Sequence, residues 1–367
     1  MKGELIDLTK SLIEIRSESH DLEKVNEAHE FIKNYITSSV NCKVKVFEHN
    51  RVRSYYYYYN NKGPEICLCG HIDVVPDLDE GFVPWSDDVY IHGRGAGDMK
   101  GGVASIVLSF INNSDKNVSL LITGDEEVGS DNGAGFVCEH ISPSAMIITE
   151  FSNNKLVLTE KGGVWVDLFV TGPGGHASRP WKAKNAVDIL FDYVSRIRSE
   201  FEDLKEKKWV NTINVGSFIG GEVSSEELGF PNKIAQKASC RLDIRVVESS
   251  SVKEVFDMIQ RKGFELNDEL GEDYIVSSLI FKEIDMMHTP KDNLFVDLFL
   301  RSMEDNGLEK LIIKTAGGSD GRFFSKRGVP VLIFGPVSID HHSTNEKVRI
   351  DSLIKTYEVI NTFLKKV

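Results

Sequence analysis

Five short stretches of the chain hold histidine and carboxylate side chains, which can bind metal ions or transfer protons. His71 and Asp73 are two residues apart, so in an extended segment their side chains share a face. A carboxylate beside an imidazole is the arrangement that orients a metal-bound histidine. The five stretches are residues 70–76 with His71 and Asp73, 93–102 with Asp98, 123–129 with Glu126 and Glu127, 147–150 with Glu150, and 340–346 with His341 and His342.

Taken singly, each stretch has a plainer interpretation as a polar loop or a solvated turn. Four of the five, however, follow apolar runs that predict strands, and the carboxyl ends of parallel strands form the ligand crevice of an α/β sheet. Histidine nitrogen with carboxylate oxygen and no thiolate suits zinc, cobalt or manganese. Two ions about 3.5–4 Å apart that share a bridging carboxylate can activate water and hold a carbonyl oxygen. The chemistry indicated is hydrolysis.

The elements expected to position these residues alternate between strand and helix in both outer parts of the chain. This alternation predicts an α/β fold with a mainly parallel sheet covered on both faces. The middle part has the order strand, helix, strand, strand, helix, strand, which is typical of a ferredoxin-like α+β unit. We therefore expect one discontinuous domain, residues 1–163 and 284–367, interrupted by a smaller insert at residues 164–283.

Composition narrows the classes of partner. The chain has 367 residues and a formal net charge of −13, which argues against nucleic-acid binding. Its apolar runs are far shorter than the roughly 20 residues that cross a membrane. Five scattered cysteines and an N-terminus without a signal peptide pattern predict reduced thiols and a cytoplasmic protein.

Five strings in order extend the interpretation from chemistry to a family. GHIDVVP, GRGAGDMKGG, GDEEVGS, GPGGHAS and HSTNE span residues 70 to 346. Together they resemble the dinuclear zinc amidohydrolases and exopeptidases that include succinyl-diaminopimelate desuccinylase, acetylornithine deacetylase, aminoacylase and carboxypeptidase G. The resemblance implies a zinc-peptidase-like catalytic domain with an inserted dimerisation (lid) domain, and a homodimer formed through that insert.

The resemblance also implies a role for individual residues. Glu126 would be the general base, and His176 of GPGGHAS would reach the partner subunit's site and steady the oxyanion. A cis peptide bond is expected at Asp98-Met99. His342 is favoured over His341 because of its spacing to Asn345-Glu346. For two divalent ions, most simply Zn²⁺ with Co²⁺ or Mn²⁺ as alternatives, the implied ligands are His71 and Glu150 for the first, Glu127 and His342 for the second, Asp98 bridging both, and Asp73 orienting His71.

The glycine-rich run Gly317-Gly318-Ser319-Asp320-Gly321-Arg322-Phe323 favours one substrate within the family. It resembles a GGTSDGRF-type string of succinyl-diaminopimelate desuccinylases, with one residue fewer. We therefore expect hydrolysis of N-succinyl-L,L-diaminopimelate in lysine and diaminopimelate biosynthesis, with acetylornithine deacetylase, another N-acyl-amino-acid hydrolase or a dipeptidase as alternatives. Arginine suits bidentate carboxylate binding. The candidate substrate-binding residues are Arg179, Lys233, Arg245, Gly318, Ser319 and Arg322.

Three interpretations of other classes remain open at this point. Residues 317–321 fit G-x-S-x-G between a predicted strand and helix, so a serine hydrolase would use Ser319 with Asp340 and His341. That interpretation leaves the carboxylates of the other four stretches unexplained. A binding protein that lost catalysis would be expected to lack a ligand or the base. A dinucleotide site at residues 93–97 lacks the G-x-G-x-x-G register.

Overall fold

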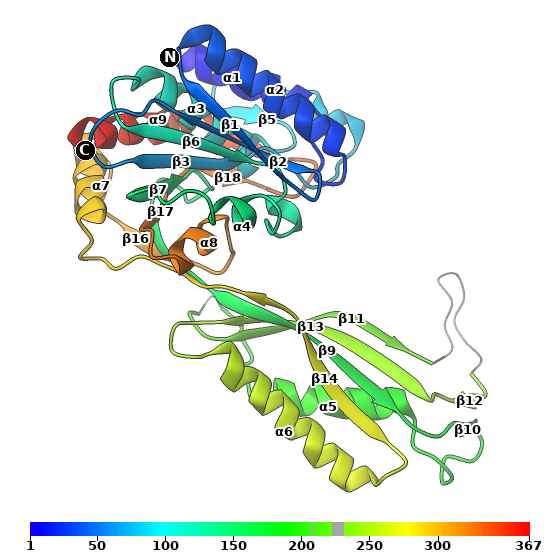
Figure 1. Cartoon of the computed structure of the whole chain (residues 1–367). Coiled ribbons are helices and arrows are strands. Elements are labelled where there is room, and N and C mark those ends of the chain that lie inside the picture. Colours follow the sequence, from blue (N-terminus) through cyan, green and yellow to red (C-terminus); the bar gives the residue numbers. More distant parts are fainter. Residues whose placement is uncertain (207, 222–230) are drawn as a thin grey trace. The chain divides into compact units, whose positions relative to one another are not determined.

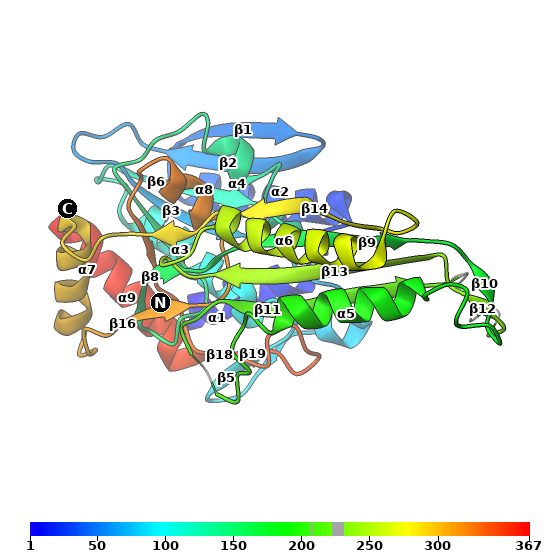
Figure 2. The same cartoon turned by 90° about the horizontal axis from the view of Figure 1, so that it is seen from below.

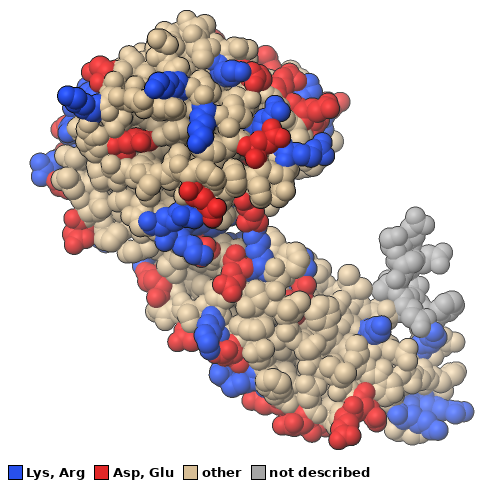
Figure 3. Space-filling view, in the orientation of Figure 1, with Lys and Arg blue, Asp and Glu red and all other residues tan. Residues whose placement is uncertain are grey.

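The computed structural model describes residues 1–206, 208–221 and 231–367 (Figure 1). Two compact units divide the chain: Met1–Glu160 with Met287–Val367, and Lys161–Met286. Each unit has its own hydrophobic core. No helix in the described part of the chain is both long enough and apolar enough to cross a membrane. On the face that Figure 3 shows, basic and acidic side chains are interspersed over most of the surface.

The first unit is built on a nine-stranded sheet in the order β1-β2-β6-β3-β7-β17-β8-β15, with β16 paired to β8. β6, β3, β7 and β17 run parallel in its centre. The strands are β1 (Lys43–His49), β2 (Val52–Tyr58), β3 (Ile66–His71), β6 (Val118–Thr123), β7 (Ala145–Ile148), β8 (Leu156–Glu160), β15 (Met287–His288), β16 (Ile312–Thr315) and β17 (Val331–Ile333).

Every residue of β3, β6 and β7 is buried, so both faces of the central sheet are covered. α3 packs on β3 and β6 and contacts α1 and α9, while α8 packs on β15 and β17. The helices of this unit are α1 (Lys2–Glu14), α2 (Leu22–Ser39), α3 (Gly101–Asn112), α4 (Ala134–Val137), α7 (Leu294–Asp305), α8 (Gly321–Lys326) and α9 (Ile350–Lys366).

The predicted α/β class is confirmed, and the sheet proves mixed rather than mainly parallel at its margins. β1 and β2 form a hairpin whose two loop residues, Asn50 and Arg51, have φ of 47° and 70°. Two consecutive positive φ values fit the two-residue turn that joins antiparallel strands without splaying them. The antiparallel pairing of β1 with β2 therefore follows from this short connection, because a parallel pair needs a much longer crossover.

The order in which the chain adds strands to the sheet reverses around the central strand β3. The chain runs from β3 through α3 to β6 on one side, and after β6 it crosses to β7 on the other side of β3. Such a reversal of strand order opens a crevice at the carboxyl ends of the strands, which is where α/β sheets bind ligands. His71, the last residue of β3, therefore lies at the expected place for a site.

A small sheet in the same unit joins the chain before α3 to the chain before α9. Its order is β18-β19-β5-β4, all antiparallel. The strands are β4 (Trp85–Ser86), β5 (Tyr90–His92), β18 (Ser338–Ile339) and β19 (Lys347–Arg349). Pairing of β19 with β5 fixes the segment around His342 against the segment around Asp98.

The second unit has a four-stranded antiparallel sheet in the order β11-β13-β9-β14, with α5 and α6 on one face (Figures 1 and 2). Alternate residues of β13 are buried, as expected for a sheet covered on one face. Order and chain connection match the ferredoxin-like expectation. The elements are β9 (Gly162–Thr171), β10 (Gly175–His176), α5 (Ala186–Arg198), β11 (Thr212–Gly220), β12 (Lys233–Ile234), β13 (Lys237–Val246), α6 (Val252–Leu270) and β14 (Ile275–Ile284).

Candidate metal centre

Three neighbouring strands of the central sheet deliver the polar residues to one edge. His71 ends β3, Glu126 and Glu127 lie in the turn after β6, and Glu150 comes two residues after β7. Because these strands are parallel neighbours, their carboxyl ends meet at the same edge. Residues that are far apart in the sequence are thereby brought together, as the pattern of strand ends predicted.

His71, Asp98 and Glu150 form the first group that could hold a metal ion. Nε2 of His71 lies 3.2 Å from Oδ1 of Asp98 and 3.3 Å from Oε1 of Glu150. The His71 side chain is only 1 % exposed. An imidazole nitrogen and two carboxylate oxygens that converge in this way make a donor set suited to zinc and neighbouring metals.

Asp98, Glu127 and His342 form the second group. Nε2 of His342 lies 3.1 Å from Oδ2 of Asp98 and 3.2 Å from Oε2 of Glu127. Asp98 thus offers Oδ1 to the first group and Oδ2 to the second. A carboxylate that faces two donor groups with different oxygens is the arrangement that lets two ions share one ligand.

Asp98 lies in a short turn immediately before α3. The peptide bond between Asp98 and Met99 is cis, as the family resemblance implied. Gly95, at the start of the turn, has φ of 80°, a conformation that glycine adopts without strain. The turn therefore brings a buried carboxylate back over the end of β3.

Asp73 contacts the site differently from the simple expectation. Nδ1 of His71 lies 2.9 Å from the backbone carbonyl oxygen of Asp73 and 3.5 Å from its carboxylate. The carboxylate accepts hydrogen bonds from the backbone N–H groups of Glu126 and Glu127, at 3.1 and 3.2 Å. Asp73 therefore orients His71 through its main chain and holds the turn that carries Glu126 through its side chain.

Ser19 supports this arrangement and went unnoticed in the sequence. Its hydroxyl donates to Oδ2 of Asp73 at 2.7 Å. The two residues are 54 positions apart, and a serine after α1 carries no local signal of a metal site. Only the fold brings it to Asp73.

Burial and the close packing of acids and imidazoles shift the pKa values of the site. Burial disfavours the charged form of Asp98, but hydrogen bonds with His342 and His71 outweigh it and lower the pKa of Asp98. Hydrogen bonds with the carboxylates of Asp98 and Glu127 raise the pKa of His342 to about 10. Burial, reinforced by the charge of Asp98, raises the pKa of Glu150 to about 7. The centre is therefore crowded with acids that need positive charge nearby.

Glu126 belongs to neither donor group. Burial raises the pKa of Glu126 well above its usual range, and the charges of Glu150, Asp320 and Asp98 act in the same direction. A buried carboxyl group of raised pKa is suited to take up a proton.

Ser319 and Arg322 of the glycine-rich run are buried and contact the interior. Ser319 is 1 % exposed, and its hydroxyl donates to Oε2 of Glu160 at 2.7 Å. The guanidinium of Arg322 donates to the backbone carbonyls of Ser319 and Gly129, at 2.9 and 2.7 Å. Gly318 is exposed. Arg322 therefore ties the glycine-rich run to the segment that follows Glu127.

The proposed serine nucleophile has the wrong neighbour for that chemistry. Its hydroxyl hydrogen is directed to a carboxylate, whereas the ring of His341 stacks on Phe151 with centroids 4.2 Å apart. A nucleophilic serine needs a base within hydrogen-bond reach that is itself oriented by a third group. The contacts of Ser319 favour a supporting role.

The remaining candidate residues belong to the second unit. Arg245 makes two hydrogen bonds to the carboxylate of Asp243, at 2.9 and 3.1 Å. His176 pairs with Lys233 across β10 and β12, and its Nδ1 lies 2.9 Å from the hydroxyl of Ser178. Arg179 is exposed. His176, Lys233 and Arg179 are thus gathered near one end of this unit, while Arg245 lies on the sheet.

Comparison with known proteins adds an independent finding. The family model described as Peptidase family M20/M25/M40 matches residues 67–366. A succinyl-diaminopimelate desuccinylase of Wolbachia pipientis is 25% identical, with 100% of this chain and 94% of the relative covered.

Solved structures share the fold. An aminopeptidase PepT of Bacillus cereus superposes with a TM-score of 0.81 at 19% identity, covering 100% of this chain and 98% of that chain. A dinuclear metal-binding peptidase of Bacillus subtilis superposes with a TM-score of 0.72 at 12% identity, with 100% and 98% covered. At these sequence identities the superpositions show a shared fold and nothing further about function.

Proposed function

The chain belongs to peptidase family M20/M25/M40 and is a metal-dependent hydrolase, and we propose that it cleaves the amide bond of an N-acyl amino acid. N-Succinyl-L,L-diaminopimelate is the first candidate substrate, with succinate and diaminopimelate as products. One observation carries the proposal: Asp98 faces His71 with one carboxylate oxygen and His342 with the other. That geometry suits two metal ions and the hydrolysis of a carbonyl compound.

The donor set fits Zn²⁺, with Co²⁺ or Mn²⁺ as alternatives, because each group offers one imidazole nitrogen together with carboxylate oxygens and no thiolate. His71 and Glu150 would hold the first ion, Glu127 and His342 the second, and Asp98 both. When bound, the ions would lower the pKa of water and polarise the amide carbonyl.

The protein's own residues would complete the reaction. Glu126, held by the hydrogen bonds between Asp73 and the turn backbone, would take the proton from the attacking water and pass it to the leaving amine. His176 would stabilise the developing negative charge on the carbonyl oxygen, as the family resemblance implies. The partner subunit is its proposed source, as the family resemblance also implies.

The glycine-rich run and the names of relatives that are 25–28% identical support the succinyl substrate. Arg245 and Arg322 were expected to bind substrate carboxylates, yet Arg245 is engaged by Asp243 and Arg322 by two carbonyls. Acetylated amino acids such as N-acetylornithine, and dipeptides, therefore stay in the proposal as alternatives.

A substrate panel tests the proposed function. Protein stripped of metal and reloaded with Zn²⁺ or Co²⁺ is assayed on N-succinyl-L,L-diaminopimelate, N-acetylornithine and dipeptides, with unreloaded protein as the control. We expect metal-dependent turnover, highest in kcat/KM for the succinyl compound. Faster turnover of N-acetylornithine would make it the proposed substrate in place of the succinyl compound. The absence of metal-dependent hydrolysis across the whole panel would favour a non-catalytic binding role.

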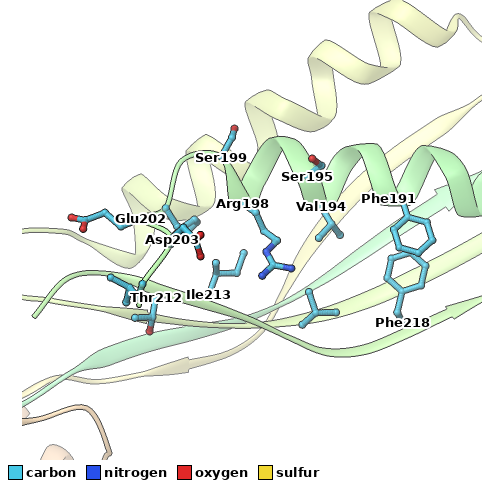
Figure 4. Close-up of a pocket in the computed structure, with 13 residues that line it drawn as sticks. Phe191, Val194, Ser195, Arg198, Ser199, Glu202, Asp203, Thr212, Ile213 and Phe218 are labelled. Carbon is cyan, nitrogen blue, oxygen red and sulfur yellow. The ribbon is translucent and has the colours of Figure 1, made fainter. Parts of the chain in front are cut away.

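We also propose a homodimer formed through the second unit. β11 is an edge strand, so one row of its backbone donors and acceptors is available to a second copy. Beside it lies a pocket of about 1030 Å³ between α5 and β11 (Figure 4). Phe191 is 59% exposed and stacks on Phe218, with ring centroids 4.5 Å apart. Two stacked phenylalanines beside an open strand edge offer apolar surface to a two-fold contact.

Light scattering of the wild-type protein and of Phe191→Glu tests the dimer. We expect the wild type at twice the chain mass and the variant shifted toward the monomer, with a matching loss of kcat if His176 acts across the interface. Phe264→Glu, on the exposed surface of α6, is the matched control. A monomeric wild type would contradict the proposal.

Five free thiols further support a reducing, cytoplasmic location.

A further inference from the structure

Glu346 lies four residues after His342, in the stretch HSTNE, and it is the buried acid of that stretch. Its side chain is 1% exposed. Oε1 accepts hydrogen bonds from the backbone N–H groups of Gly97 and Asp98, at 3.0 and 3.1 Å. One carboxylate oxygen of the His342 segment thus holds the backbone of the residue that faces both donor groups.

Arg94 holds the other oxygen of Glu346. Nη1 of Arg94 donates to Oε2 of Glu346 at 2.6 Å, and Nη2 lies 3.1 Å from Oδ2 of Asp77. The side chains of Arg94 and Asp77 are each 3% exposed. A buried guanidinium between two carboxylates fixes direction as well as charge, because its donors lie in a rigid plane.

The backbone around this network is equally constrained. The N–H of Gly93 donates to the carbonyl oxygen of Glu346 at 3.0 Å, and Lys347 pairs with His92 across β19 and β5. A Cβ atom added at Gly97 would clash with Oγ of Ser338. The segments before Asp98 and after His342 therefore pack closely, which leaves little freedom for Asp98 to move relative to His342.

We propose that Glu346 is a positioning residue of the metal centre. Through the backbone of Asp98 it sets where the shared carboxylate lies relative to His342, and Arg94 and Asp77 hold Glu346 in that orientation. The inference rests on the proposed function, since it needs a centre of two ions bridged by Asp98. Supports of this kind, one step removed from the ligands, commonly govern metal affinity.

Co²⁺ titration tests the proposal. Metal-free wild type, Glu346→Gln and the control Glu358→Gln are titrated with Co²⁺, and the visible absorption of the bound ion is followed. Glu358 makes an exposed ion pair with Lys355, so its change removes the same charge away from the centre. We expect roughly 10- to 100-fold weaker Co²⁺ binding and an altered spectrum in Glu346→Gln only.

Kinetics separate positioning from a general loss of structure. We expect Glu346→Gln to lower kcat with KM within about twofold, and to retain a cooperative thermal transition without metal. If Glu346→Gln does not fold, Arg94→Lys decides, because it keeps the charge beside Glu346 but loses the planar fork. Arg94→Lys should bind Co²⁺ more weakly than the wild type and the control do. It should bind Co²⁺ more tightly than a ligand variant such as His342→Ala.

Two results would overturn parts of the inference in distinguishable ways. The first result is a folded Glu346→Gln whose Co²⁺ affinity and spectrum equal those of the wild type, or the same outcome in Arg94→Lys if Glu346→Gln does not fold. This result would reject the positioning role and leave the proposed function intact. A wild-type protein that binds no Co²⁺ would reject the proposed function and the positioning role with it.

Discussion

Nε2 of His342 lies 3.1 Å from Oδ2 of Asp98, so a residue near the end of the chain meets a turn more than two hundred residues earlier. The adjacent His341 instead stacks on Phe151. Two consecutive histidines thus have different partners, because His342 has φ of 62° and the backbone turns between their side chains. Motif spacing favoured His342 over His341 as the metal ligand, and the contacts of the two side chains favour the same residue.

The first prediction compares these two histidines. His342→Ala should lower the bound metal from about two ions per chain to about one and cut kcat at least about 100-fold, because the second donor group loses its nitrogen. His341→Ala, the matched control, should keep both ions. Metal content after dialysis and steady-state rates measure the two effects. Loss of metal from His341→Ala with none from His342→Ala would reverse the assignment.

The second prediction concerns Glu126 and Glu127, which are neighbours with different expected roles. Glu126→Gln should keep both metal ions and lower kcat by roughly 10²–10⁴-fold, as expected for loss of a general base. Glu127→Gln should lose metal as well as rate, since Oε2 of Glu127 faces His342 at 3.2 Å. Metal analysis and kinetics on the same preparations separate the two. Wild-type activity in Glu126→Gln would remove it from the mechanism.

How much of this centre could be predicted depends on where each partner lies in the chain. His71, Asp98, Glu126 and Glu150 could be singled out because each stands beside a strand end or a glycine-rich turn with a recognisable pattern. Ser19 could not, since its contact with Asp73 exists only after α1 has packed. The fold class followed from the alternation of strands and helices, whereas the antiparallel pairings of β2 with β6 and of β15 with β8 join segments far apart in the sequence and carry no local signal.

Charge type alone did not reveal which groups the two arginines contact. Arg245 and Arg322 were selected because substrate carboxylates need cations, but a sequence does not reveal which cations are already engaged. In the structure, Asp243 holds Arg245, and the carbonyls of Ser319 and Gly129 hold Arg322. The assignment of these two residues to substrate binding therefore stays a prediction that needs a direct test.

The third prediction makes that test at Arg322. If the guanidinium of Arg322 serves to tie Ser319 to Gly129, Arg322→Lys should weaken that tie, because the single ammonium of lysine lacks the planar fork that reaches both carbonyls. The variant should then lower kcat/KM for succinyl and acetyl substrates by similar factors, within about threefold of each other. Parallel assays of both substrates give the ratio. A selective loss of more than about tenfold for the succinyl compound would show a carboxylate contact and contradict the tie.

The fourth prediction concerns Ser319 and the buried Glu160. Burial raises the pKa of Glu160 to about 8, although its hydrogen bond from Ser319 favours the charged form. Ser319→Ala should destabilise the protein by about 1–3 kcal/mol, because a buried carboxyl loses a donor, while hydrolysis persists. Chemical denaturation and rate assays measure these. Abolition of wild-type activity by a serine-reactive phosphonate, with no effect of a chelator, would favour the serine hydrolase instead.

The fifth prediction uses His29, which is fully buried on α2 and stacks on Tyr55 with ring centroids 4.7 Å apart. Burial lowers the pKa of His29 from 6.5 to about 4, although the charge of Asp73 opposes the shift. Between these values the unfolded chain binds a proton that the folded chain does not, so stability falls as the pH falls from 6.5 towards 4. With about 1.4 kcal/mol per pKa unit, the loss amounts to about 3 kcal/mol.

His29→Phe isolates this effect, because phenylalanine keeps a ring against Tyr55 and does not titrate. The free energy of unfolding of both proteins is measured by denaturant between pH 4 and pH 8, with a chelator present so that metal binding does not contribute. Buried acids such as Glu160 contribute slopes of the opposite sign, but these are common to both proteins and cancel in the difference. The wild type should lose about 3 kcal/mol relative to the variant from pH 6.5 to pH 4, and a difference that does not change with pH would show that His29 is protonated as readily in the folded chain as in the unfolded one.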